Sequence, residues 1–481
     1  MYQYKTKPYQ HQRDALNKGA LLKNYAYFME MGTGKTKVII DNATYLYQLG
    51  DIKEVIVIAP NSVYRNWVQE ISVHSPITPY IWCWKVDKEK ELIKATKANE
   101  AECEWDAKRN LIYILMNVEA LSHKSGQRWL QQRLNLNGKV SMMVIDESTT
   151  IKSPAALRTK AICKLSTTVK YRRILTGSPV TKSPLDLYTQ CAFLSKALLG
   201  FDSYYTFRAR YAVMQQIELG GRQILIPKYY TNLDELEGKL KEFSFRVTKE
   251  ECLDLPPKVY MQRDIHLTLE QKTIYETLKK KARAIIEDDT VSFANKLVEI
   301  LRLHQICNGF LKTDKGEIYV FKNNPKLKEL LRILEEAPGK CIIWATYVHN
   351  IESIKQTLGD LYGKDSVVSI YGKDSVEVRK NAVENFQHND GCQFLVGNPS
   401  TGGYGLTLTA ARNVIYFSNS YNLEVRKQSE DRAHRIGQKD KVNYIDLIVP
   451  DSIEMMIISA LKRKIKLSAA TLGEEAKKWL S

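Results

Sequence analysis

Short runs of aliphatic residues, separated by stretches with helical spacing, recur along this chain of 481 residues. The runs are nearly continuous in Val, Ile and Leu, which is typical of strands buried on both faces of a parallel sheet. We therefore predict an α/β protein with two such sheets, because the runs form an early and a late group. The early runs are VIVIAP (55–60), LIYILMN (111–117), MMVIDE (142–147) and RILTGSP (173–179), and the late runs are CIIWA (341–345), FLVGN (394–398), VIYFSNS (414–420) and NYIDLIV (443–449).

Between the two groups the pattern becomes helical, and the chain is too long for one ordinary core. Residues 186–242 are predicted to form a helical, aromatic-rich insertion, and residues 269–308 a second helical protrusion. The sequence LPPK at 255–258 is predicted to be a stiff linker, because proline fixes φ and blocks a helix. We expect a first lobe over residues 1–250 and a second lobe over residues 251–481, ending in a helix that contains LKRKIK (461–466).

The charge balance favours a polyanionic partner such as nucleic acid. The chain has 71 Lys and Arg against 54 Asp and Glu, a formal net charge of +17. Its eight cysteines are scattered without a CxxC pair, so we expect reduced thiols and no zinc site. No apolar run approaches the ~18 residues of a membrane span, and the first residues lack the apolar core of a signal peptide, so a cytoplasmic protein without membrane contact is expected.

The segment EMGTGKT (30–36) has the composition of a phosphate-binding loop. Its glycines would let the backbone turn so that successive N–H groups point into one concavity at a helix N-terminus. Lys35 would reach the β- and γ-phosphates of a nucleotide, and the Thr36 hydroxyl would bind Mg²⁺. The full pattern needs glycine where this chain has Met29, so only the short GxGKT form matches, and an incidental turn is the alternative. The predicted nucleotide-binding residues of the loop are Gly32, Thr33, Gly34, Lys35 and Thr36.

The segment VIDES (144–148) ends a predicted strand in two carboxylates. Burying such a pair is unfavourable unless a cation compensates its charge. Asp146 would hold the Mg²⁺, and Glu147 would orient and deprotonate an attacking water molecule. An exposed acidic turn is the alternative, and the presence of GKT upstream favours the nucleotide site.

The segment PYQHQRDAL (8–16) precedes the phosphate loop and contains two glutamines. A glutamine amide both donates and accepts hydrogen bonds, so it matches the edge of adenine. We favour Gln12 over Gln10 as the adenine-binding residue, because HQRDAL leads directly into a predicted helix. A surface glutamine is the alternative.

The segment QSEDRAHRIGQ (428–438) carries two arginines near the end of the chain. Gln428, Arg432 and Arg435 have the spacing i, i+4 and i+7, which predicts one face of a helix. A solvated basic face is one interpretation. The other is that the two guanidinium groups of the second lobe reach the γ-phosphate held by the first, an effect worth roughly 10³–10⁵ in rate.

Taken in order, six segments of the chain resemble the superfamily 2 helicase-type ATPases: EMGTGKT, VIAPNSVYRNWVQE, VIDESTTIK, LTGSPV, VGNPSTGGYGLTLTAARNVIYFSNSYN and QSEDRAHRIGQ. The ending HRIGQ, downstream of YFSNSYN, resembles the SNF2 branch. The resemblance extends over residues 8–460 and looks like a compact viral or prokaryotic member. It implies two RecA-like lobes with helical protrusions, ATP bound between the lobes, and duplex DNA crossing both.

The resemblance also implies roles for individual residues. Lys35, Thr36, Asp146 and Glu147 fall at the family's phosphate, magnesium and water-activating positions, and Arg432 and Arg435 at its arginine-finger positions. By the same matching, the DNA-contacting residues are Pro60, Asn61, Ser62, Trp67, Thr401, Gly402 and Gly403, the coupling residues are Thr176, Gly177 and Gln428, and Gly405 is nucleotide-binding.

The chain departs from the family pattern at three places. It has DEST where the family usually has DEAH or DEGH, MEMGTGKT where the family has DEMGLGKT, and LTGSP in place of LTGTP. The first departure removes a histidine from the network that couples hydrolysis to motion of the lobes.

From these observations we predict a DNA-dependent ATPase that uses ATP and Mg²⁺ and moves along double-stranded DNA. Its contacts to the DNA backbone would carry no sequence information, as a motor that regrips at every base requires. We expect a monomeric motor in a bacterial or virus-infected host cytosol, with a nuclear location also compatible. The alternatives are a strand-separating or annealing helicase of the same fold, and a nucleic-acid-binding scaffold that does not hydrolyse ATP.

Overall fold

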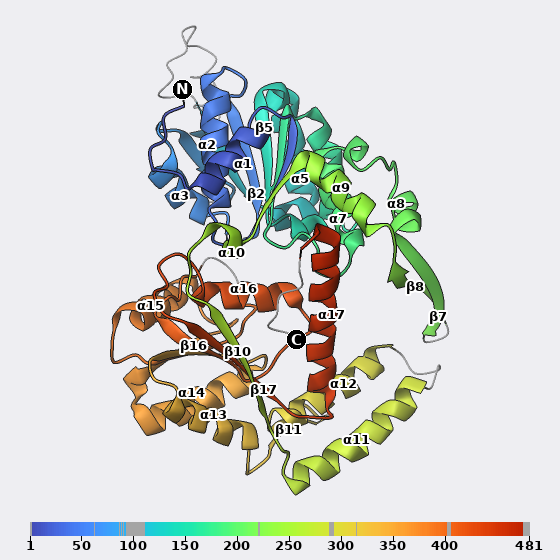
Figure 1. Ribbon diagram of the computed structural model, residues 1–481, viewed down its shortest axis with the longest axis vertical. Coiled ribbons are helices and arrows are strands. Elements are labelled where there is room, and N and C mark those ends of the chain that lie inside the picture. The colour runs from blue at the N-terminus through green and yellow to red at the C-terminus, as the bar shows by residue number, and fades with distance from the viewer. Residues whose placement is uncertain are drawn as a thin grey trace. The chain divides into compact units, whose positions relative to one another are not determined.

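The computed structural model describes residues 2–61, 63–85, 87, 89, 91–92, 111–219, 222–287, 293–313, 315–401 and 406–474. The chain forms two compact units, each built around a parallel sheet (Figure 1). The first unit comprises residues 1–212, 230–254 and 468–474. The second comprises residues 213–229 and 255–467.

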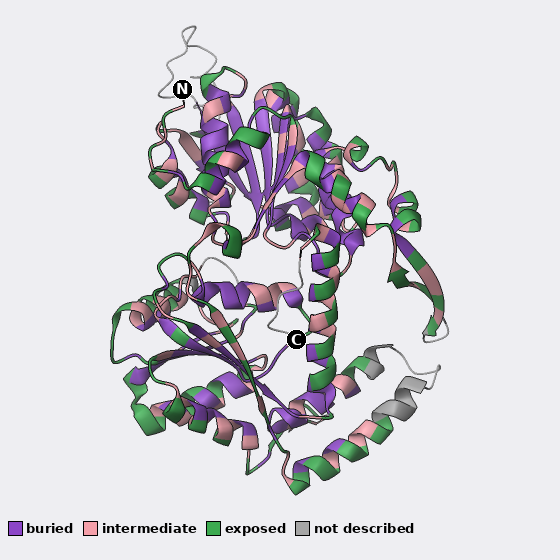
Figure 2. Cartoon of the chain, in the orientation of Figure 1, coloured by how far each residue is buried: buried purple, intermediate pink, exposed green. Residues whose placement is uncertain are grey.

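The first unit contains a sheet of seven strands in the order β3-β4-β2-β5-β6-β1-β9, all paired in parallel. Every residue of β2 and β5 is buried, so both faces of the sheet centre are covered, as the aliphatic runs predict (Figure 2). The strands are β1 (Asn24–Met29), β2 (Glu54–Ala59), β3 (Tyr80–Cys83), β4 (Ile112–Asn117), β5 (Ser141–Asp146), β6 (Tyr171–Leu175) and β9 (Ser244–Val247). The helices are α1 (Gln10–Gly19), α2 (Lys35–Gln48), α3 (Asn66–His74), α5 (Lys124–Asn137), α6 (Leu157–Leu165), α7 (Leu187–Leu194), α8 (Tyr204–Tyr211), α9 (Leu233–Phe243) and α10 (Lys249–Cys252).

The second unit contains a sheet of six parallel strands in the order β10-β17-β16-β13-β15-β14. Its strands are β10 (Lys258–Asp264), β13 (Lys340–Trp344), β14 (Val367–Ile370), β15 (Phe394–Gly397), β16 (Ala411–Tyr416) and β17 (Val442–Ile448). Its helices are α11 (Leu269–Glu287), α12 (Phe293–Cys307), α13 (Pro325–Glu336), α14 (Val348–Tyr362), α15 (Val376–His388), α16 (Leu423–Ala433) and α17 (Ile453–Leu472), with a small hairpin of β11 (Phe310–Lys312) and β12 (Ile318–Val320). The predicted α/β class with two parallel-sheet lobes is confirmed.

All eight predicted strands are present, but the pattern analysis misses several others. β10 is an edge strand without a fully buried residue, and β9 alternates between half-buried and buried positions, so neither reads as a continuous aliphatic run. β1 lies inside the sheet, yet its buried side chains are mainly aromatic rather than aliphatic. The aliphatic strands are therefore predicted from the sequence, whereas the aromatic and edge strands are not.

The prediction that residues 186–242 are helical throughout is wrong in its middle part. α7, α8 and α9 are present, but β7 (Ala212–Leu219) and β8 (Arg222–Tyr230) form a two-stranded hairpin between α8 and α9. The sequence GG joins these strands, and glycine pairs of this kind are a hairpin signal that outweighs a helical interpretation. The second protrusion is helical as predicted, in α11 and α12.

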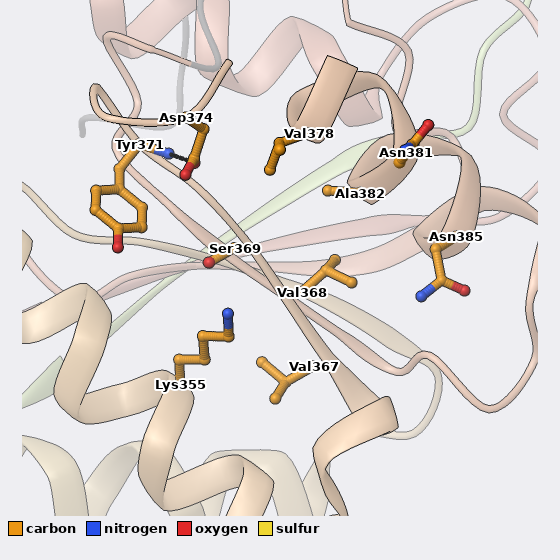
Figure 3. Close-up of a pocket in the computed structure, with 10 residues that line it drawn as sticks. All are labelled: Lys355, Val367, Val368, Ser369, Tyr371, Asp374, Val378, Asn381, Ala382 and Asn385. Atoms are coloured by element: carbon orange, nitrogen blue, oxygen red, sulfur yellow. Dashed lines mark hydrogen bonds between the residues drawn. The ribbon is translucent and has the colours of Figure 1, made fainter. Parts of the chain in front are cut away.

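A hollow of about 350 Å³ lies beside β14, the edge strand of the second sheet (Figure 3). Lys355 of α14 points toward it, Asn381 and Asn385 of α15 lie along its other side, and Tyr371 N donates to Asp374 Oδ2 at 2.7 Å. None of the predicted site residues lines this hollow.

Two further observations bear on the sequence expectations. Over the ranges given above, no helix is both long enough and apolar enough to cross a membrane. The seven cysteines that the structure describes are free thiols, and Cys103 lies outside the described residues.

Candidate active site

Three turns meet at one edge of the first sheet. β1, β6 and β5 are neighbours, and their register places Asp146 opposite Leu175 and Leu175 opposite Tyr27. Because the strands are parallel, the turns that follow them lie at the same edge. The sequence predicts the phosphate loop after β1, the two carboxylates after β5 and Thr176–Gly177 after β6. The fold therefore brings these three predicted segments together.

The phosphate loop has the backbone conformation that its glycines predict. Gly32 and Gly34 have φ values of 82° and 87°, which glycine adopts readily and other residues rarely adopt. α2 begins at Lys35, and its N-cap is Gly34, which has no side chain that could cap the first turn. The first N–H groups of this helix are thus without a side-chain cap and suit a bound phosphate. The Lys35 ammonium is buried and donates to Glu30 O at 3.4 Å, inside the loop.

Asp146 ends β5 as a buried carboxylate with two hydrogen bonds. Only 6% of its surface is exposed. Its Oδ1 accepts from the backbone N–H of Glu147 and its Oδ2 from the indole N–H of Trp67, both at 3.0 Å. Burial raises the pKa of Asp146 above its ordinary value, and the Trp67 hydrogen bond, the positive charge of Lys35 and the Glu147 N–H offset this only in part. These three partners favour the ionised form, which is the form that can hold a divalent cation.

Glu147 follows Asp146 in a strained backbone conformation. Its φ and ψ of 49° and 64° are left-handed, which costs a residue other than glycine about 1–3 kcal/mol. The side chain is 8% exposed, so it is not part of a solvated acidic turn. Strain of this kind persists where the surroundings fix the backbone, and it is concentrated at functional sites.

The prediction that the Trp67 side chain contacts DNA is wrong. Its indole is 1% exposed and packs in the core of the first unit, with its N–H on Asp146. Sequence matching places Trp67 on the segment after β2 but does not show which way the indole points. Of the neighbouring candidates, Asn61 is exposed, Pro60 is buried with its carbonyl accepting from Val63 N and Tyr64 N, and Ser62 lies outside the described residues.

Gln12 is tied to the phosphate loop. Its Oε1 accepts from Tyr9 N at 3.1 Å, and its Nε2 donates to Thr33 O at 3.0 Å. His11, which the sequence analysis missed, also places Nε2 within 2.8 Å of Thr33 O. α1 therefore anchors the loop through two side chains. Adenine recognition by Gln12 stays a prediction, and it would use the remaining hydrogen-bonding capacity of the amide.

The turn after β6 packs directly on the phosphate loop. Thr176 N donates to Tyr27 O at 3.3 Å, and a Cβ built on Gly177 would lie 2.8 Å from Met31 N. Arg246, which no motif indicates, donates to Phe28 O at 2.9 Å and to Gly177 O at 3.0 Å. The two turns are therefore in direct contact, and the coupling role of Thr176 and Gly177 stays a prediction.

Replacing Gly177 by alanine is expected to disturb the phosphate loop. The added methyl group would meet backbone that cannot swing away, and overpacking of this kind costs about 1–3 kcal/mol. We expect a loss of that size in ATP affinity, in stability, or shared between them, measured by ATP titration and thermal unfolding. The control is Gly238→Ala in α9, where nothing lies within 4 Å of the new methyl group. If Gly177→Ala behaves like this control, the close packing of the two turns has no functional role.

The sequence DEST lacks the histidine of the family pattern, and its serine forms a buried hydrogen-bonded pair. Ser148 Oγ donates to Gln190 Oε1 at 2.6 Å. Gln190 Nε2 in turn donates to Pro179 O and Asp186 O, each at 2.8 Å. The turn after β5 is thus linked to the segment after β6 through α7. Gln190 carries no motif signal, so the sequence analysis missed it.

The helix predicted to carry both arginines is shorter than the spacing of Gln428, Arg432 and Arg435 suggests. Gln428 and Arg432 lie on α16, but the helix ends at Ala433, so Arg435 is not on the same helical face and that prediction is wrong. The carbonyls of the last turn are satisfied from outside the helix, because Leu408 N donates to Arg432 O and Gln438 Nε2 donates to Ala433 O, both at 3.0 Å. Gln438, also missed by sequence, therefore takes part in ending the helix.

The two arginines nevertheless converge on one backbone segment of the second unit. Arg432 and Arg435 both direct Nη1 at Leu406 O, at 3.3 and 3.4 Å, and Arg435 also donates to Thr407 Oγ1 at 2.9 Å. Arg432 is 3% exposed, which excludes a solvated basic face at this position. Gln428 is buried and donates to Glu424 Oε1 at 3.4 Å. Thr401 is half-buried, while the predicted residues Gly402, Gly403 and Gly405 lie outside the described residues.

Comparison with known proteins places these observations in a family. The model of the SNF2-related domain matches residues 13–310, and that of the Helicase conserved C-terminal domain matches residues 323–437. An uncharacterized ATP-dependent helicase of Mycoplasma genitalium is 27% identical over 452 residues, and a putative ATP-dependent helicase/translocase of Bacillus subtilis is 26% identical over 457 residues. Each alignment covers 93% of this chain but only 40% and 46% of these relatives, so the chain spans less than half of their length.

Among solved structures, the SWI2/SNF2 ATPase core of Sulfolobus solfataricus in complex with dsDNA is similar, with 25% identity and a TM-score of 0.44. The alignment covers 98% of this chain and 95% of that chain. The family resemblance of the motifs is confirmed by the first family model, which spans more than half of the sequence. The chain is a member of the SNF2-related family.

Proposed function

We propose that this protein is an ATPase that uses ATP with Mg²⁺, is stimulated by double-stranded DNA and moves along it. The observation that carries the proposal is the convergence, at one edge of the first sheet, of a phosphate loop, a buried lysine and two buried carboxylates. Relatives named as an ATP-dependent helicase and a helicase/translocase support ATP hydrolysis coupled to movement on nucleic acid.

The residues of the first unit suit a nucleotide with its metal ion. The N–H groups at the start of α2 would bind the phosphates, and Lys35 would move from Glu30 O to the β- and γ-phosphates. The Thr36 hydroxyl and the Asp146 carboxylate would hold Mg²⁺, which would neutralise charge on the phosphates. Glu147 would then orient a water molecule and take its proton.

The second unit would complete the reaction. Arg432 and Arg435 would stabilise the charge that develops on the γ-phosphoryl group, so hydrolysis would depend on closure of the two lobes. DNA contacts would come from Asn61 in the first lobe and from the segment beginning at Thr401 in the second. The net charge of +17 suits backbone contacts of this kind, which are independent of sequence.

ATP turnover measured with and without duplex DNA tests the proposal. We expect stimulation by duplex DNA, and Lys35→Ala serves as the background for contaminating ATPases. Nucleotide or DNA binding without turnover would instead support a non-hydrolysing scaffold.

Strand separation is the second candidate activity, because both bacterial relatives are named helicases. A triplex-displacement assay distinguishes it from duplex tracking. A motor that tracks duplex displaces the third strand without opening the duplex, whereas a helicase also releases a strand from a forked duplex.

A further inference from the structure

The bond between Trp67 and Asp146 joins two parts of the first unit that are far apart in sequence. Trp67 lies in the first turn of α3, directly after the segment that follows β2. Its indole N–H reaches Asp146 Oδ2 at the end of β5 across 3.0 Å. Both side chains are buried, so water does not compete for this bond.

The bond restricts how the Asp146 carboxylate can turn. Its other oxygen accepts the N–H of Glu147, so the two donors together fix both oxygens. Without the indole N–H, the carboxylate would keep a single bond to its own neighbouring residue and could rotate about it. Trp67 therefore determines the orientation of the group that would hold Mg²⁺.

The segment that leads to Trp67 is exposed and carries a cation. Asn61, Arg65 and Asn66 are exposed around the buried indole, and the Arg65 guanidinium lies 5.6 Å from the centre of the Tyr64 ring. Val63 N and Tyr64 N donate to Pro60 O at 2.8 and 3.1 Å, which ties the residues before α3 to the end of β2. An arginine and two amide side chains are suitable partners for DNA phosphates.

We propose that Trp67 is a positioning residue that transmits DNA binding at Asn61, Arg65 and Asn66 to the orientation of Asp146. The inference rests on the proposed function and adds a route by which DNA stimulates hydrolysis. DNA phosphates bound by Arg65 and its neighbours would hold the start of α3 in place, so that the indole N–H keeps the carboxylate in the orientation that suits Mg²⁺.

The test is Trp67→Phe, which keeps an aromatic ring in the core but removes the N–H. We expect the stimulation of ATP turnover by duplex DNA to fall by about tenfold, the effect of one hydrogen bond to a charged group. In DNA-free protein, the Mg²⁺ concentration needed for half-maximal binding of a fluorescent ADP should rise. A residue that only fills the core would lower the unfolding temperature without changing either quantity.

Trp129→Phe is the matched control. The Trp129 indole N–H also donates to a carboxylate, Glu89 Oε1 at 2.8 Å, but this bond is exposed and neither residue is a predicted site residue. We expect its stimulation and Mg²⁺ dependence to equal those of the wild type. Should Trp67→Phe fail to fold, benzothienylalanine at position 67 keeps the shape of the indole and replaces its N–H by sulfur.

The outcomes separate the two proposals. If duplex DNA does not change the ATP turnover of the wild-type protein, the proposed function is refuted. A stimulated wild type with a Trp67→Phe variant that matches it in stimulation and in Mg²⁺ dependence would overturn the inference alone. Loss of stimulation because the variant no longer binds DNA would also overturn it, since the indole would then serve the DNA contact itself.

Discussion

Replacing Glu147 by glutamine is expected to lower ATP turnover by roughly 10²–10⁴, the usual contribution of a general base. The carboxamide has the same shape, so the left-handed backbone and the burial at the end of β5 are retained. It cannot accept a proton from water, however. We therefore expect ATP to bind with near wild-type affinity and the unfolding temperature to stay unchanged, while turnover is lost.

The control for this change is Glu119→Gln, at an exposed position of the same unit. It removes one negative charge from the protein without touching the candidate site, so turnover should remain at the wild-type level. Normal hydrolysis by Glu147→Gln would show that another group is the base. Loss of ATP binding would show instead that the carboxylate serves the nucleotide rather than the water.

Replacing Arg435 by alanine is expected to lower DNA-stimulated turnover by roughly 10³–10⁵, the range measured for arginine fingers. The substitution removes the guanidinium that now donates to Thr407 Oγ1 and Leu406 O. Arg435→Lys should be nearly as damaging, because an ammonium lacks the planar fork of donors that matches a phosphate. Turnover and the affinity for duplex DNA should be measured on the same preparations.

Arg412→Ala provides the comparison in the second unit. The Arg412 side chain is exposed and pairs with Asp440 at 3.0 Å, a kind of surface ion pair that contributes little. Its turnover and DNA affinity should be close to wild type. If Arg435→Ala loses DNA affinity while its unstimulated turnover is normal, the guanidinium binds nucleic acid and the finger assignment fails.

The sequence predicts the fold well where burial is aliphatic. VIVIAP and MMVIDE become β2 and β5 because central parallel strands need apolar side chains on both faces. β10 is not predicted in this way, because it is an edge strand with a neighbouring strand on one side only, and none of its residues is fully buried. Motif spacing locates the residues of the phosphate loop and the two carboxylates, because these chemical roles are carried by short contiguous segments.

The spacing of motifs does not predict contacts between segments that are far apart in the sequence. The indole of Trp67 turns inward because Asp146, far along the chain, offers an acceptor. α16 ends before Arg435 because Gln438 and Leu408 satisfy its last carbonyls, which the periodicity of the arginines does not reveal. Gln190 and Arg246 belong to no motif, yet each joins two of the turns at the site.

Residues 468–474 belong to the first unit, although they are synthesised after the second unit. Glu474 pairs with Arg246, the residue that also binds the carbonyls of Phe28 and Gly177 beside the phosphate loop. During vectorial synthesis, the first lobe emerges long before the segment that supplies this carboxylate. The ion pair between Arg246 and Glu474 can therefore form only after the whole second sheet has been translated.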